Sequence, residues 1–186
     1  MNTVTIRRAT QADVSTVVDI WTEASEWLRQ RGSDQWQYPI RMDNVRNAIA
    51  GRACWIIERP VGGPVGIVTV DEQADPELWE PTDQPDRALY LYGLVVRLDC
   101  RTQHLGAAIL DWASLRAQTL GKIWLRLDAW TSNEQLHQYC LNRGFRQVRT
   151  VDGPGVVSGV LFERPAGKVE GLGPIIVEPA EPGGRR

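Results

Sequence analysis

The chain has 186 residues, of which 42% are hydrophobic and 24% charged, and its formal net charge is −2 at pH 7. This length and composition predict one soluble globular domain with a substantial core, while the absence of a basic run argues against nucleic-acid binding. Neither a membrane-spanning apolar run nor the pattern of a signal peptide is present. The 3 cysteines and 2 histidines form no metal-ligand spacing, so we expect no metal, reduced thiols and a cytoplasmic location.

The first half of the chain predicts strands and helices joined by short turns. Thr10 precedes an acidic residue at the third following position, which is a helix-start pattern, and Gly32 is a natural helix end. Residues 71–86 are acidic and rich in proline, which predicts a surface loop. In chain order, the expected elements are a strand at 3–8, a helix between Thr10 and Gly32, a shorter helix at 41–50, and hairpin strands at 54–58 and 65–70.

The middle third carries the most informative pattern. A run of β-type residues at 89–96 leads into a turn at 101–107, and an apolar helix pattern follows. A strand that delivers a short turn onto a helix start gathers unpaired backbone N–H groups at the positive end of the helix dipole. Gly106 and Ala107 leave room for an anion to approach the backbone. The turn is therefore predicted to hold a diphosphate.

The remaining elements include a strand at 123–130, a helix at 134–143 and a final strand pair at 145–151 and 156–162. Residues 165–186 are rich in proline and glycine without periodicity, which favours a disordered tail after a domain at residues 1–164. The alternative is that the apolar triplet at 175–177 adds a strand or docks on a partner.

From residue 94 to residue 145 the chain resembles the acyl-CoA-binding core of the GCN5-related N-acetyltransferase (GNAT) family. The family pattern is a strand, Arg/Gln-x-x-Gly-x-Gly/Ala, a helix, a strand, Asn, a helix and Gly-Phe. The matching residues, in this order, are Arg101-x-x-His104-x-Gly106, Asn133 and Gly144-Phe145. The resemblance implies an α/β (α+β) single domain with a mixed, largely antiparallel central sheet flanked by helices. It also implies direct transfer of an acetyl group from acetyl-CoA to an amine.

By this resemblance, a strand backbone would pair with the pantetheine arm, the turn would wrap the diphosphate, and an asparagine would contact the arm. The residues expected to bind acetyl-CoA are Val95, Val96, Arg101, Thr102, Gln103, His104, Leu105, Gly106, Ala107 and Asn133. The sequence departs from the family where His104, and often Thr102, replaces glycine. A side chain there narrows the space for phosphate or demands a different backbone angle.

The resemblance leaves proton transfer open. Asp128 stands where some family members have a glutamate base, and the alternative is an ion pair between Asp128 and Arg126. The tyrosine that commonly acts as the general acid in the family corresponds in position to Cys140, one residue after Tyr139. Three interpretations follow, in which Tyr139, Cys140 or no residue protonates the leaving thiolate. Further bases that the sequence does not rank are Asp71, Glu72, Glu23 and Glu26.

In the family, the acceptor lies between the N-terminal helices and the later strands. The residues expected around it are Trp27, Asp34, Trp36, Tyr92 and Trp130. Aromatic rings with a carboxylate suit a cationic, partly apolar amine of a small molecule or peptide, although such rings also serve as packing. An acyl-CoA-binding sensor or carrier without turnover is the alternative function, and pairing of C-terminal strands is compatible with a homodimer.

Overall fold

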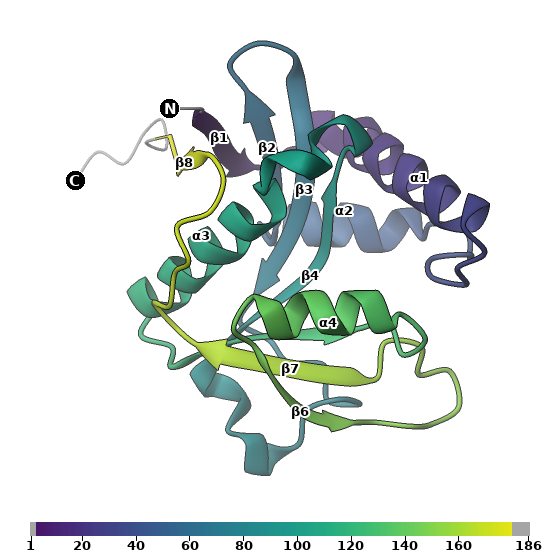
Figure 1. Cartoon of the computed structure of the whole chain (residues 1–186), viewed down its shortest axis with the longest axis vertical. Coiled ribbons are helices and arrows are strands. Elements are labelled where there is room, and N and C mark those ends of the chain that lie inside the picture. Colours follow the sequence, from purple (N-terminus) through teal and green to yellow (C-terminus); the bar gives the residue numbers. More distant parts are fainter. Residues whose placement is uncertain (1–2, 180–186) are drawn as a thin grey trace.

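The computed structural model describes residues 3–179, which form a sheet of 8 strands covered by helices on both faces (Figure 1). The strands are β1 (Thr3–Arg8), β2 (Cys54–Arg59), β3 (Gly63–Asp71), β4 (Ala88–Val96), β5 (Trp124–Ala129), β6 (Arg146–Thr150), β7 (Val160–Pro165) and β8 (Ile175–Val177). The helices are α1 (Val14–Gln30), α2 (Met42–Ala50), α3 (Leu105–Thr119) and α4 (Glu134–Asn142).

The strand order is β6-β7-β5-β4-β3-β2-β1-β8. Only the β4–β5 and β1–β8 pairs are parallel, and the other neighbours are antiparallel. The predicted class, a mixed and largely antiparallel sheet flanked by helices, is therefore confirmed.

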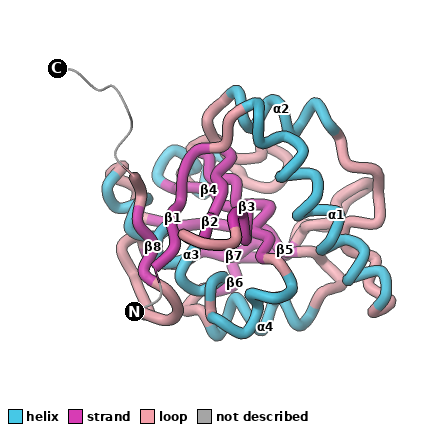
Figure 2. Tube along the Cα trace, turned by 90° about the horizontal axis from the view of Figure 1, so that it is seen from above, coloured by secondary structure: helices cyan, strands magenta, loops and turns pink. Residues whose placement is uncertain are grey.

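Helices α1 and α2 cover one face of the sheet. The apolar side of α1 buries Val17, Ile20 and Ala24, because residues spaced three and four apart lie on one side of a helix. These side chains pack with Ile56 of β2 and Ile67 of β3. Figure 2 shows the strands running between this helix layer and the one formed by α3 and α4.

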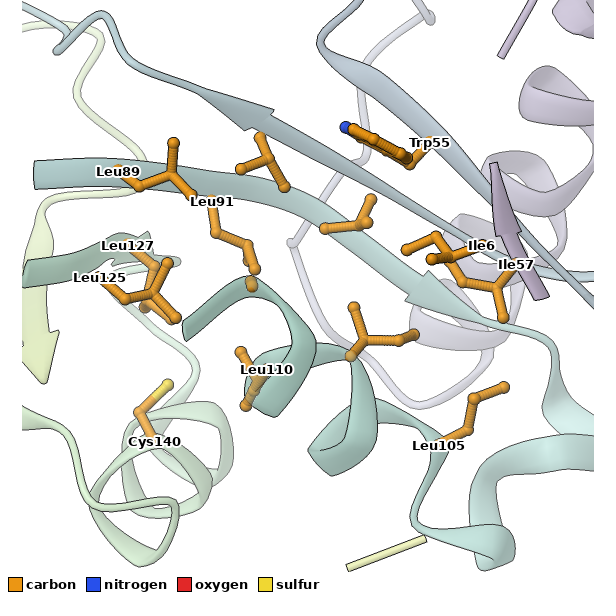
Figure 3. Close-up of a cluster of buried hydrophobic side chains, with 14 of the residues drawn as sticks. Ile6, Trp55, Ile57, Leu89, Leu91, Leu105, Leu110, Leu125, Leu127 and Cys140 are labelled. Atoms are coloured by element: carbon orange, nitrogen blue, oxygen red, sulfur yellow. The ribbon is translucent and has the colours of Figure 1, made fainter. Parts of the chain in front are cut away.

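Helix α3 covers the opposite face and is buried over most of its length. Leu105 and Leu110 of α3 join the leucines of β4 and β5 in the larger core, and Cys140 of α4 completes it (Figure 3). The alternation of side chains along a strand explains why Leu125 and Leu127 face this core while Arg126 faces the other way. Helix α3 thus covers β4 and β5 on this face, whereas α1 packs on β3 and β4 on the other face.

The segment after β7 is ordered up to residue 179, which differs from the favoured interpretation of a disordered tail. Residues 175–177 form β8, which pairs with β1, so the alternative interpretation describes them better. Buried Asp111 of α3 accepts hydrogen bonds from the backbone N–H groups of Glu170 and Gly171, both at 2.9 Å. These partners lie far away in the sequence, which explains why local periodicity gave no sign of the segment. Residues 180–186 of the expected tail lie outside the described residues.

The acidic loop at 71–86 is more strongly anchored than a surface loop. Leu78 and Trp79 are buried, and two 3-10 turns follow at Pro81–Asp83 and Pro85–Arg87. Asp83 pairs with Arg149 of β6 at 2.6 Å. The loop thus covers the part of the sheet that α1 and α2 leave open.

The final hairpin is shorter than expected. Strand β7 begins at Val160, four residues later than predicted. The N–H group of Val151 bonds to the carbonyl of Gly159, so the residues between them form a wide loop instead of a strand.

Candidate active site

A bulge in β4 opens the sheet at its centre. Ile67 pairs with Val95 and Thr69 with Tyr92, so β4 has two residues, Gly93 and Leu94, where β3 has one. Gly93 adopts a φ of 59°, a left-handed conformation that glycine reaches without strain. The parallel pairing of β4 with β5 ends just before the bulge, at Leu91 and Leu127. Beyond this point, the edges of β4 and β5 that face each other are not paired in the sheet.

A cavity of about 290 Å³ occupies this opening. Its wall includes β4, β5, the start of α3 and one side of α4. The predicted residues that line it are Trp36, Tyr92, Val95, Val96, Arg101, Gly106, Asp128, Asn133, Tyr139 and Cys140. The sequence predicts separate cofactor, catalytic and acceptor roles for these residues, and the fold brings them to one cavity.

The turn before α3 contains a short 3-10 segment, Leu98–Gln103, followed by His104. His104 has a φ of 54°, so it adopts the left-handed angle for which glycine is the usual residue, and its side chain is exposed. The backbone thus keeps, with histidine, the left-handed angle that a glycine would adopt here, at the steric cost that a β-carbon adds. The first N–H groups of α3 have no partner within the helix, as at any helix start, and Gly106 lies among them at the cavity wall.

Arg101, a residue of this turn, is the one cationic side chain among the described residues that line the cavity. Its guanidinium stacks on Trp27, with the central carbon 3.6 Å from the ring centre, and Arg31 stacks on the same ring at 4.2 Å. Burial and the positive charge of Arg31 lower the pKa of Arg101. Trp27, expected at the acceptor, instead holds two arginines and lines neither described cavity.

Other residues of the turn contribute differently. The side chain of Gln103 accepts a hydrogen bond from Arg59 at 2.8 Å. Leu105 and Ala107 are buried in the core, so only their backbone is suited to an anion. The side chain of Thr102 lies outside the described part of the chain.

Asn133 joins α4 to the loop that follows α1. As the N-cap of α4, its Oδ1 accepts a hydrogen bond from the N–H of Leu136 at 2.9 Å. Its Nδ2 donates to Oε1 of Gln35 at 2.6 Å, and Gln35 is itself buried and lines the cavity. Gln35 lies between two residues expected at the acceptor, Asp34 and Trp36, but nothing local in the sequence indicates its contact with a residue 98 positions away.

Asp128 is the acidic side chain of the cavity wall. Burial raises the pKa of its carboxyl group to about 6, an effect that a hydrogen bond with Ser158 partly opposes. The interpretation of Asp128 as an ion-pair partner of Arg126 is wrong. Arg126 pairs with Glu163 at 2.9 Å and donates to the hydroxyl of Tyr90 at 3.2 Å.

The other candidate bases named from the sequence form ion pairs with other residues or do not line a described cavity. Glu23 pairs with Arg97 at 2.5 Å, Glu26 with Arg29 at 2.6 Å and Glu72 with Lys122 at 2.9 Å. Asp71 lines neither described cavity. Asp128 is thus the carboxylate best placed to act in the opening.

Tyr139 and Cys140 both reach the cavity, in different environments. A β-carbon placed on Gly106 would lie 3.0 Å from the hydroxyl oxygen of Tyr139, so this hydroxyl borders the turn before α3. Cys140 is only 2% exposed, and burial raises the pKa of its thiol to about 12. At neutral pH the thiol is therefore protonated and packed in the core.

A second cavity, of about 900 Å³, lies on the α1 and α2 side of the bulge. Trp21, Tyr38, Arg41 and Asn44 line it from the helices and the loop between them, and Val157 lines it from the loop before β7. Tyr92 and Gly93 line both cavities. The bulge is thus the point at which the two cavities meet.

The comparisons with known proteins agree with this architecture. No protein-family model matches the chain. A curated protein of Bacillus subtilis, the uncharacterized N-acetyltransferase YesJ, is 25% identical over 142 residues, which cover 74% of this chain and 78% of YesJ. A GNAT-family acetyltransferase structure from Listeria monocytogenes superposes with a TM-score of 0.71 at 22% identity, covering 86% of this chain and 93% of that one. The chain has the GNAT fold.

The family resemblance stated from the sequence is thereby confirmed. A further structure, that of YncA from Salmonella typhimurium with its cofactor acetyl-CoA, has a TM-score of 0.62 at 16% identity. The superposition covers 90% of this chain and 96% of the YncA chain. Within residues 3–179, no group of three or more histidine, cysteine or acidic side chains is arranged to hold a metal, and no described helix is long and apolar enough to cross a membrane.

On the acceptor side of this GNAT fold, the expected residues divide into two groups. Tyr92 borders both cavities and Trp36 lines the smaller one. Asp34 accepts hydrogen bonds from Trp130 at 3.1 Å and from Ser132 at 2.5 Å, and neither Asp34 nor Trp130 lines a described cavity. Asp34 therefore fastens its loop to the start of α4 instead of facing a bound amine.

Proposed function

We propose that this protein is an N-acetyltransferase that moves an acetyl group from acetyl-CoA to a primary amine by direct attack. The observation that carries the proposal is the cavity at the β4 bulge, which has a helix start and the half-buried carboxyl group of Asp128 in its wall. A neighbour of the same fold is described with acetyl-CoA as its cofactor, which supports the same cosubstrate here.

The cofactor would enter between β4 and β5. The backbone groups of Val95 and Val96 at the cavity wall are suited to pair with the pantetheine arm. The N–H groups near Gly106 would receive the diphosphate, whose charge suits the positive end of α3 and the guanidinium of Arg101. Asn133, which also lines the cavity, would contact the arm.

Asp128 would accept the proton of the amine. An amine must be deprotonated before it attacks the thioester carbonyl, and a general base works best when its pKa lies near the working pH. Burial brings the pKa of Asp128 to about 6, which meets this requirement better than an exposed aspartate does. Attack forms the amide bond, breaks the thioester bond and releases CoA as a thiolate that takes up a proton.

Tyr139 is the better placed proton donor for that thiolate. Its hydroxyl reaches the cavity beside Gly106, whereas the Cys140 thiol belongs to the hydrophobic core. Both groups are protonated at neutral pH, because burial raises the pKa of Tyr139 as well as that of Cys140. Location, not acidity, therefore favours Tyr139.

The proposal is tested by the release of free CoA thiol from acetyl-CoA in the presence of a panel of primary amines. We expect release that depends on both the amine and the protein, with the acetylated amine detected by mass spectrometry. Binding of acetyl-CoA without amine-dependent release would contradict the transferase and favour the sensor or carrier.

Tyr139→Phe is expected to lower kcat by about tenfold. This is less than the usual effect of a general acid, because a thiol of pKa about 8.5 is already a good leaving group. Cys140→Ala should leave kcat unchanged while reducing the free energy of unfolding by about 1–2 kcal/mol, since a buried side chain is lost. The kinetics and urea unfolding of both variants check this assignment, and a fall in kcat confined to Cys140→Ala would reverse it.

A further inference from the structure

The larger cavity has an unusual charge distribution for a site that receives amines. Among the described residues that line it, Arg41 is the single charged side chain, and no carboxylate contributes to the wall. Arg41 is exposed, and no described carboxylate forms an ion pair with it. Its neighbour Asp43 is 92% exposed and pairs with Arg46 instead.

Negative charge gathers around Tyr92, which lines both cavities. Burial raises the pKa of the Tyr92 hydroxyl, and the negative charges of Asp71, Asp128 and Asp75 raise it further. The junction of the two cavities at Tyr92 therefore has carboxylates near it, with Asp128 in the wall of the smaller cavity, and is suited to a cationic amine.

Tyr38 lines the larger cavity together with Arg41 and is influenced by both charges. Burial raises the pKa of the Tyr38 hydroxyl. The positive charge of Arg41 lowers this pKa, and the negative charge of Asp128 raises it, so both charges act on the same side chain. Arg41 lines only the larger cavity and Asp128 only the smaller one, with Tyr92 and Gly93 at the junction. A molecule that reaches from Arg41 to Asp128 would cross the larger cavity, whose wall includes an apolar and aromatic stretch with Trp21 and Val157.

We propose that the acceptor amine carries an anionic group, such as a carboxylate, at the end remote from the amine, and that Arg41 binds this group. This inference rests on the proposed function, because it identifies the acceptor of the same transfer. The guanidinium offers paired donors to a carboxylate, the apolar stretch takes the body of the molecule, and the amine lies toward Asp128. Asp34, which sequence analysis expected to hold a cation, is engaged by Trp130 and Ser132.

The test compares phenethylamine with 4-(2-aminoethyl)benzoate, a pair that differs only in the remote carboxylate. Each amine is titrated by calorimetry into the protein with excess CoA present. We expect the benzoate to bind about fivefold more tightly, as suits a partly exposed arginine–carboxylate pair. Arg41→Gln should remove this preference, whereas Arg46→Gln, a matched change on an exposed arginine that lines neither cavity, should retain it.

Equal affinities in the unmodified protein, binding of neither amine, or a preference that survives Arg41→Gln would overturn the inference. CoA thiol release with the same two amines separates it from the proposed function. Release without a preference for the benzoate would support the transferase and contradict the role of Arg41. An Arg41-dependent preference without release would support the anionic acceptor site and contradict the transferase.

Discussion

Gly106→Glu is expected to weaken acetyl-CoA binding by about 100-fold or more. A β-carbon at this position would already lie 3.0 Å from the hydroxyl of Tyr139, so a longer side chain must extend into the cavity or displace that ring. The added carboxylate would also oppose the diphosphate at the helix start, where N–H groups and Arg101 otherwise favour a negative charge. Calorimetric titration of the purified variant with acetyl-CoA measures the loss.

Gly153→Glu is the matched control for this experiment. Gly153 is exposed in the loop before β7, and a β-carbon there would make only an ordinary contact, 3.5 Å from Val156. The control adds the same charge to the same residue type and should keep the affinity of the unmodified protein. If Gly106→Glu remains folded and binds acetyl-CoA as tightly as the control does, the cofactor does not use the start of α3.

Asp128→Asn is expected to lower kcat/KM by about 100- to 10,000-fold, the usual contribution of a general base. The carboxylate accepts a proton only when ionised, so the rate of the unmodified enzyme should rise as pH increases through about 6. The variant should lack this rise and retain only the part due to ionisation of the amine. A pH–rate profile of both proteins, recorded with one amine, distinguishes the two contributions.

The same substitution should stabilise the protein above neutral pH. The folded-state pKa of Asp128 is about 6 against an ordinary value of 3.8, so ionisation costs the folded state more than the unfolded one. This cost is absent below pH about 4, grows between pH 4 and 6, and is complete above pH 6. We expect Asp128→Asn to raise the free energy of unfolding by about 2 kcal/mol at pH 8 and to leave it unchanged at pH 4.

Urea unfolding at the two pH values measures this effect without relying on activity. Asp152→Asn, which changes an exposed carboxylate of the loop before β7, is the control and should leave both rate and stability unchanged. Reduced activity with no gain in stability at pH 8 would mean that Asp128 positions the substrate rather than accepting its proton.

The sequence by itself determined the order of strands and helices up to β7, the turn onto α3 and the asparagine that begins α4. These features depend on local chemistry. Apolar spacing identifies helix α1, a small residue at Gly106 leaves a helix start accessible, and the side chain of Asn133 caps the backbone three residues ahead. Each signal lies within a few residues of the structure that it specifies.

Only the tertiary structure decided which side chains share a cavity and which are engaged elsewhere. Asp34 is held by Trp130 and Ser132, nearly 100 positions away, and the segment leading to β8 is ordered by Asp111 of α3. The raised pKa of Asp128 likewise comes from burial by distant elements, not from its neighbours in sequence. Contacts of this kind depend on which surfaces meet after folding, and neither composition nor periodicity records that information.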